Sequence, residues 1–135
     1  MKISSILETC LYAEDLEQAK SFYSALPGID FLAEEPGRHL FFRCGGGMLL
    51  IFNPKHTSSE QTQINGVDIP LHGSKGEGHI AFSIDEDNLD QWREFLIENN
   101  IPIESEVTWP NGSVSLYLRD PAGNSLELVS ASIWK

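Results

Sequence analysis

Cysteine and long apolar runs are both scarce in this chain. Its 135 residues include only Cys10 and Cys44, too few for a disulfide framework. The longest apolar run, Met48 to Phe52, has the length of a strand, whereas a membrane helix needs about 18–20 residues. The apolar stretch before Glu8 is too short for a signal peptide. We therefore expect a cytoplasmic protein with no membrane partner, in which both cysteines are small buried side chains.

Positive charge is also scarce. Nine basic residues face twenty acidic ones, so the formal net charge is -11 at pH 7. This balance repels phosphate backbones and argues against a nucleic-acid partner. A solvated acidic surface is the ordinary interpretation, and affinity for a cationic ligand is the alternative.

Apolar periodicity predicts a strand, a helix and three further strands in the first part of the chain. The first strand covers residues 5–13. Asp15 is placed to cap a helix, with Gln18 three residues later as in a capping box, and Pro27-Gly28 ends that helix. Further strands are predicted at 30–34, 39–44 and 48–53, separated by glycine-rich turns.

The same order of elements returns near the C-terminus. We predict a strand at 79–85, a helix capped by Asn88, and strands at 104–108, 113–119 and 125–131. The apolar positions of the two helices align at an offset of 73 residues, as Leu16 with Leu89 and Tyr23 with Leu96 illustrate. The chain therefore contains an internal repeat.

These elements predict an α+β fold of two paired βαβββ modules. Neither half is large enough to bury a core well alone, so we expect a single domain over 1–135, in which curved mixed sheets surround a cavity and helices cover the outer faces. Module one spans about 1–54, and module two spans about 78–135. The polar stretch of about 55–77 between them is long for a structureless loop, which indicates a linker or an active-site lid.

Strand alternation places three metal-ligating side chains, Glu8, His79 and Glu127, on the predicted cavity faces of three strands. Burying an isolated carboxylate is costly. Two carboxylates and one neutral imidazole instead neutralise a divalent ion, and this donor set suits Mn, Fe, Ni or Zn. The alternative is ordinary: a hydrogen-bonded strand histidine and exposed glutamates near strand ends.

Three segments resemble the vicinal oxygen chelate superfamily, which includes glyoxalase I, bleomycin-resistance proteins and extradiol dioxygenases. They are residues 7–23, the strand 78–84, and the closing hairpin and strand 116–129. The resemblance implies a single glyoxalase-like domain in which Glu8, His79 and Glu127 occupy metal-ligand positions. Two departures weaken particular assignments. Segment 48–53 lacks the acid that glyoxalase I-like members add, which weakens the assignment as glyoxalase I. Glu8 stands where many members have His or Gln, which makes an extradiol dioxygenase less favoured.

The resemblance implies a metal-dependent lyase or isomerase whose ion chelates a small oxygenated substrate and stabilises negative charge on it. Glu8 and Glu127 are the candidate catalytic proton carriers. A non-enzymatic, bleomycin-resistance-type drug-binding protein and an extradiol-type dioxygenase are the alternatives. A homodimer is also expected. Further candidates for binding substrate, each with an ordinary structural alternative, are Arg43, His72, Tyr117 and Arg119.

Overall fold

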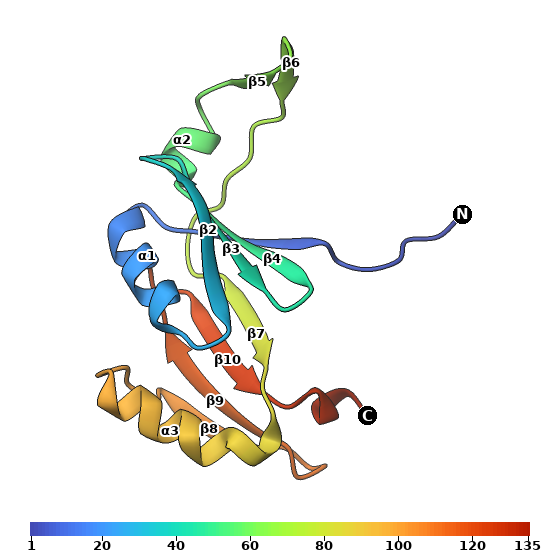
Figure 1. Cartoon of the computed structure of the whole chain (residues 1–135), viewed down its shortest axis with the longest axis vertical. Coiled ribbons are helices and arrows are strands. Elements are labelled where there is room, and N and C mark those ends of the chain that lie inside the picture. The colour runs from blue at the N-terminus through green and yellow to red at the C-terminus, as the bar shows by residue number, and fades with distance from the viewer. The chain divides into compact units, whose positions relative to one another are not determined.

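Two compact units, Met1–Gly76 and Glu77–Lys135, make up the chain. The computed structural model describes all 135 residues (Figure 1). The fold is α+β, as the sequence predicts, and each unit is built on a four-stranded mixed sheet.

The first unit contains six strands and two helices. They are β1 (Glu8–Tyr12), α1 (Leu16–Ala25), β2 (Ile29–Glu35), β3 (His39–Cys44), β4 (Gly47–Phe52), α2 (Pro54–Thr57), β5 (Thr62–Ile64) and β6 (Val67–Ile69). The sheet order is β1-β4-β3-β2, with β1 parallel to β4 and the other neighbours antiparallel. The segment between the predicted modules thus contains a short helix and the β5-β6 hairpin.

The second unit repeats this arrangement. Its elements are β7 (His79–Ser83), the 3-10 turn η1 (Glu86–Asn88), α3 (Leu89–Glu98), β8 (Ser105–Thr108), β9 (Val114–Arg119), β10 (Ser125–Val129) and the 3-10 turn η2 (Ala131–Trp134). The sheet order is β7-β10-β9-β8, again with one parallel pair, β7 and β10. The helices α1 and α3 begin and end 73 residues apart, which matches the predicted repeat offset.

The starts of the two helices differ. Asp15 caps α1: its carboxylate accepts from the Gln18 backbone N–H at 3.1 Å and from the Gln18 side chain at 2.8 Å. Asn88 occupies the predicted N-cap position of α3, but its side chain makes no capping hydrogen bond. Asp85 acts earlier instead, capping η1 through the Asp87 N–H, and η1 continues directly into α3.

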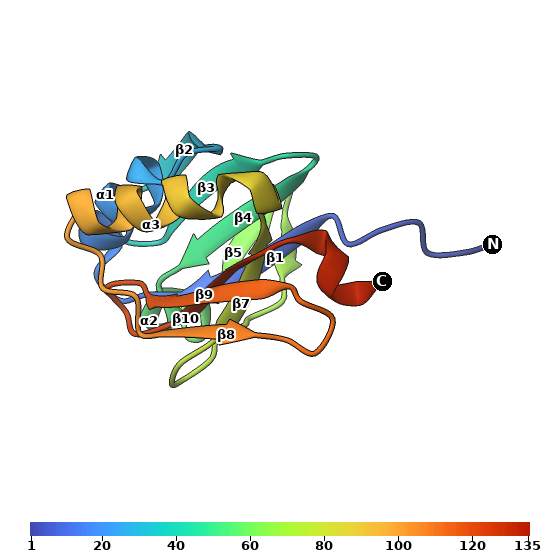
Figure 2. The same ribbon diagram turned by 90° about the horizontal axis from the view of Figure 1, so that it is seen from below.

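Each helix packs on one face of its own sheet. In unit one the Tyr23 ring of α1 contacts Phe42 of β3, with centroids 5.8 Å apart, and both side chains are fully buried. In unit two α3 runs along one face of the β7-β10-β9-β8 sheet (Figure 2). An ion pair between Arg93 of α3 and Glu106 of β8 ties this helix to the sheet. Large apolar side chains therefore fill the helix-facing side of both sheets, as the alternation predicts.

The cysteines depart from expectation. Cys10 is exposed and Cys44 is partly exposed. Cys10 is exposed because it lies on the sheet face opposite α1, the face that also carries Glu8. Burial raises the pKa of the Cys44 thiol, which keeps it neutral at pH 7.

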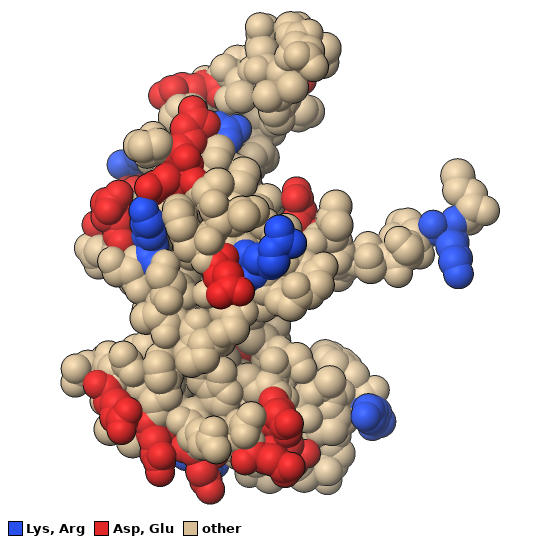
Figure 3. All heavy atoms as spheres, in the orientation of Figure 1, with Lys and Arg blue, Asp and Glu red and all other residues tan.

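None of the helices has the length and apolar character that crossing a membrane requires. Acidic side chains outnumber basic ones on the face drawn in Figure 3, in keeping with the negative net charge.

Candidate metal centre

Unit two brings two of the predicted ligands together. The parallel register of β7 and β10 pairs His79 with Ser125, so Glu127 follows two residues along β10 on the same face. The His79 Nε2 atom lies 3.5 Å from the Glu127 Oε2 atom. The two side chains differ in exposure: the His79 ring is 53% exposed, whereas the Glu127 side chain is only 9% exposed. An open imidazole therefore lies beside a buried carboxylate.

A backbone hydrogen bond orients the His79 ring. Its Nδ1 atom lies 3.0 Å from the Ser125 carbonyl oxygen. A carbonyl only accepts, so Nδ1 carries the proton and the lone pair remains on Nε2. Metal-ligating histidines characteristically donate their second ring N–H to a carbonyl or carboxylate in this way. The lone pair of His79 is thus directed to the side where Glu127 lies.

Three neighbours surround the Glu127 carboxylate. The Ser115 hydroxyl donates to Oε1 at 2.5 Å and accepts from the Trp109 indole N–H at 2.8 Å. Tyr117 lies opposite Glu127 in the β9-β10 register, and its ring stacks with that of His79 at a centroid distance of 6.4 Å. Burial, the negative charge of Glu127 and a hydrogen bond to Glu127 raise the pKa of Tyr117, so its phenol stays protonated.

The spacing of His79 and Glu127 fits two ligands of one ion. Ligands about 2.1 Å from a metal, at angles between 90° and tetrahedral, lie about 3.0–3.4 Å apart, close to the observed 3.5 Å. Nitrogen and carboxylate oxygen suit borderline divalent ions. Neither unit by itself assembles three His, Cys, Asp or Glu side chains that would hold an ion.

Glu8 belongs to the other unit. It is the first residue of β1 and is exposed, just as His79 is the first residue of β7. The two therefore hold equivalent positions in the repeat. Membership of Glu8 in a triad with His79 and Glu127 remains a prediction.

The register makes the repeat explicit on the faces that carry these residues. The row Glu8–Met48–Arg43 in unit one corresponds to the row His79–Ser125–Arg119 in unit two. The next row on the same face is Cys10–Leu50–Phe41 in unit one, and Ala81–Glu127–Tyr117 in unit two. Leu50 thus occupies the position that Glu127 has in unit two. This is the position in segment 48–53 at which unit one has a leucine in place of an acid.

The two candidate arginines differ in their surroundings. Arg119 is engaged: it donates to Glu104 at 2.7 Å, to Glu77 at 3.3 Å and to the Gly123 carbonyl at 3.0 Å. Arg43 is exposed and takes part in none of the ion pairs of the structure. Of the two, only Arg43 has its guanidinium free for an anionic ligand.

His72 has a structural role within unit one. Its Nδ1 atom forms a hydrogen bond with the Tyr12 hydroxyl at 2.8 Å, and its ring packs edge-on against Phe52. Its backbone N–H donates to the Thr57 carbonyl. These contacts fasten the segment after the β5-β6 hairpin to the sheet.

The closing motif positions the strand that carries His79. Asn124 accepts from the Gly78 N–H at 2.7 Å and donates to the Asp120 carboxylate at 2.9 Å. Asn124 and Asp120 are both buried. The sequence alone indicated no role for Ser115, and for Trp109 it favoured packing in the core or a turn. The polar residues at alternate positions of the strand 113–119 were the available signal.

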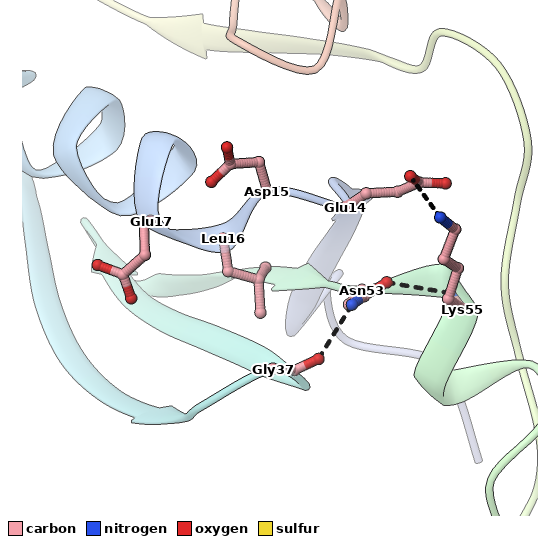
Figure 4. A pocket seen from close by; sticks show the side chains of 7 residues that line it. All are labelled: Glu14, Asp15, Leu16, Glu17, Gly37, Asn53 and Lys55. Carbon is pink, nitrogen blue, oxygen red and sulfur yellow. Dashed lines mark hydrogen bonds and ion pairs between the residues drawn. The ribbon is translucent and has the colours of Figure 1, made fainter.

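A hollow of about 550 Å³ in unit one lies around the start of α1 (Figure 4). Asn53 donates to the Gly37 carbonyl on one side, and Lys55 pairs with Glu14 at 3.0 Å on another. Asp15 is engaged as the helix cap. Asn53, Lys55, Glu14 and Asp15 thus have protein partners, and we assign the hollow no function.

Residues 5–128 match the family model of the Glyoxalase/Bleomycin resistance protein/Dioxygenase superfamily. The chain belongs to this superfamily. The crystal structure of lactoylglutathione lyase from Agrobacterium tumefaciens is 41% identical, has a TM-score of 0.90, and covers 99% of this chain and 98% of its own. Metallothiol transferase FosB from Staphylococcus epidermidis is 28% identical over 98% of this chain and 86% of its own length.

A more distant crystal structure shares the fold. The fosfomycin resistance protein FosX from Listeria monocytogenes, as a point mutant complexed with Mn(II) and 1S,2S-dihydroxypropylphosphonic acid, has a TM-score of 0.69 and 19% identity. It covers 96% of this chain and 91% of its own. At this level of identity the likeness shows a shared fold.

Proposed function

We propose that this protein is a divalent-metal-dependent enzyme of the glyoxalase type, a lyase or isomerase for a small oxygenated substrate. His79 and Glu127 are two of its metal ligands, and Glu8 is the third. The observation that carries the proposal is the His79–Glu127 pair: the ring proton is fixed on Nδ1 by Ser125, and Nε2 lies 3.5 Å from a buried carboxylate oxygen. The similarity to lactoylglutathione lyase supports the same class of reaction.

When bound, a divalent ion supplies Lewis acidity that stabilises negative charge on substrate oxygens. The chain's own residues have three tasks in this proposal. His79, Glu127 and Glu8 would hold the ion, and Glu8, the more exposed carboxylate, would move the substrate proton when it is not bound to the ion. The protonated Tyr117 phenol would help to hold the Glu127 carboxylate in place.

The first test measures metal binding. Titration calorimetry with Mn²⁺, Zn²⁺ and Ni²⁺ on metal-free protein should give one site per chain. Glu127→Ala and His79→Ala should each weaken binding by at least about 100-fold, because each removes a ligand. Glu8→Ala should also weaken it. Glu106→Ala, which removes an exposed carboxylate that pairs with Arg93, is the matched control. Equal affinity in all variants would refute the ligand set.

The second test identifies the chemistry. Protein reconstituted with Zn²⁺, Mn²⁺ or Fe²⁺ would be screened under air and under nitrogen. The substrates are hemithioacetals of glutathione with 2-oxoaldehydes, 2-oxoacids, catechols, and fosfomycin with a thiol. We expect oxygen-independent isomerisation or lyase turnover. Turnover that requires Fe²⁺ and consumes oxygen would instead indicate a dioxygenase. Ligand binding with no turnover on any metal would indicate a drug-binding protein.

Arg43 supports a substrate that carries an anionic group. It lies in one register row with Glu8, two strands away, so their Cα atoms are about 10 Å apart. The long arginine side chain presents a bidentate fork for a carboxylate or phosphonate. Arg43→Gln should raise KM for an anionic substrate by about tenfold or more with little change in kcat. Arg119→Gln, whose guanidinium is already paired, should leave KM unchanged.

A further inference from the structure

The Glu127 carboxylate has two oxygens in different surroundings. Oε1 is bonded to the Ser115 hydroxyl, whereas Oε2 lies toward Nε2 of His79. Ser115 is fully buried and Glu127 is 7% exposed. Water therefore does not replace the serine at Oε1, and the orientation of the carboxylate depends on protein groups.

The two hydrogen bonds that link Trp109, Ser115 and Oε1 of Glu127 can run in only one direction. An indole N–H donates and never accepts, so the Ser115 oxygen accepts from Trp109. The single proton of that hydroxyl is then available for Glu127, and an ionised carboxylate only accepts. The order is thus Trp109 to Ser115 to Glu127. We call these three residues the carboxylate relay.

The hairpin between β8 and β9 holds the indole in place. The Trp109 backbone N–H donates to the Ser113 carbonyl at 2.8 Å, and the Trp109 carbonyl accepts from the Gly112 N–H at 2.8 Å. Gly112 has φ of +87°, a conformation that suits glycine. The turn that the sequence marks with Pro110-Asn111-Gly112 therefore fixes the first donor of the relay.

The repeat shows that the fold does not require a carboxylate at the position of Glu127. By register, Leu50 takes the place of Glu127 in unit one and His39 takes that of Ser115. The equivalent sheet of unit one accommodates hydrocarbon where unit two buries a carboxylate. Burying an acid in unit two costs free energy that a leucine would not, which points to a chemical role for the arrangement.

We propose that Ser115 and Trp109 are positioning residues that hold Glu127 as a one-oxygen metal ligand. Oε1 is engaged by Ser115, and Oε2, which lies toward Nε2 of His79, is the oxygen that would bind the ion. This inference rests on the proposed function, because it assumes that Glu127 is a ligand. Loss of such a supporting hydrogen bond typically weakens metal affinity by about 10–100-fold.

The test compares two buried serines of the same hairpin. Ser115→Ala removes the donor to Glu127. Ser113→Ala is the matched control, because Ser113 is also buried but its hydroxyl bonds to Ser132 at 2.9 Å. Calorimetric titration of the full chain with Mn²⁺ should show affinity about 10–100-fold weaker in Ser115→Ala and within about threefold of wild type in Ser113→Ala. Ser115→Thr keeps the hydroxyl and should restore most of the affinity.

A second readout separates positioning from general destabilisation. In the Co²⁺-loaded protein, release of Oε1 lets the carboxylate bind through both oxygens, which raises the coordination number and lowers the visible absorption. We expect this change in Ser115→Ala, a weaker one in Trp109→Phe, and none in Trp134→Phe, whose exposed indole is the control.

The possible failures are distinguishable. If wild-type protein binds no Mn²⁺, or binds it independently of Glu127, the proposed function fails and the relay assignment fails with it. If binding depends on Glu127 but Ser115→Ala matches Ser113→Ala in affinity and in the Co²⁺ spectrum, only the relay assignment is overturned.

Discussion

Asn124 joins the closing motif to the strand that carries His79, and its truncation is a direct test of how unit two is built. Asn124→Ala removes the side-chain hydrogen bonds from the Gly78 N–H at 2.7 Å and to the Asp120 carboxylate at 2.9 Å, among others. A bond to a charged group contributes about 1.5–3 kcal/mol, and a neutral one about 0.5–1.5 kcal/mol. We therefore expect the variant to lose about 2–4 kcal/mol of unfolding free energy.

Urea unfolding followed by tryptophan fluorescence measures this loss. Trp92, Trp109 and Trp134 all lie in unit two, so the signal reports that unit and not unit one. Asn111→Ala is the matched control. Its side chain also makes hydrogen bonds, accepting from the Ser113 N–H and donating to the Ser132 carbonyl, but it is exposed. That variant should lose less than about 1 kcal/mol. Equal losses in the two variants would refute the reasoning from burial.

Three further predictions concern the helices and one half-buried histidine. Asp15→Ala should cost about 0.5–2 kcal/mol by urea unfolding, whereas Asn88→Ala should cost almost nothing, because only Asp15 caps its helix; equal costs would contradict the cap assignment. Leu96→Ala, at a fully buried site, should cost about 2–5 kcal/mol, and a loss below about 1 kcal/mol would show that Leu96 is not a core residue. Burial and the nearby Arg38 charge lower the pKa of His39, against a smaller opposing effect of Glu35, so the folded state binds fewer protons than the unfolded state. Stability should therefore fall as pH drops from about 6.5 toward the lowered pKa, and circular dichroism at several pH values should show a flatter profile for His39→Gln; identical profiles would contradict this.

Periodic features of the chain were predicted most accurately. The apolar positions at helical spacing located α1 and α3, and their 73-residue offset holds at both ends of both helices. The side-chain hydrogen bond expected of Asn88 does not form, because Asp85, three residues earlier, already caps a 3-10 turn that leads into the helix. Both residues are good cap formers, and only the path of the chain decides between them. The β5-β6 hairpin was missed because its strands are three residues each, too short for alternation to be recognised.

The candidate site was predictable only where the signal was local. Alternation along single strands identified His79 and Glu127 as facing the same way, and the resemblance added their role. The contact between them depends on the register of β7 against β10, which no single strand encodes. Ser115 reaches Glu127 only through the pairing of β9 with β10, and Trp109 reaches Ser115 only through the hairpin turn. The sequence therefore did not determine those contacts of the candidate site that are made by hydrogen bonds between strands.

The repeat separates what the fold requires from what the chemistry requires. On the helix-facing side, both sheets bury large apolar side chains at equivalent places, such as Leu40 and Phe42 in unit one and Leu116 and Leu118 in unit two. On the opposite side the equivalent positions differ in kind, since Leu50 and Phe41 correspond to Glu127 and Tyr117. One face thus carries the stability of each unit, and the other is free to vary. Substitutions on the helix-facing side should mainly unfold a unit, whereas those at Glu127 and Tyr117 should mainly change what the protein binds.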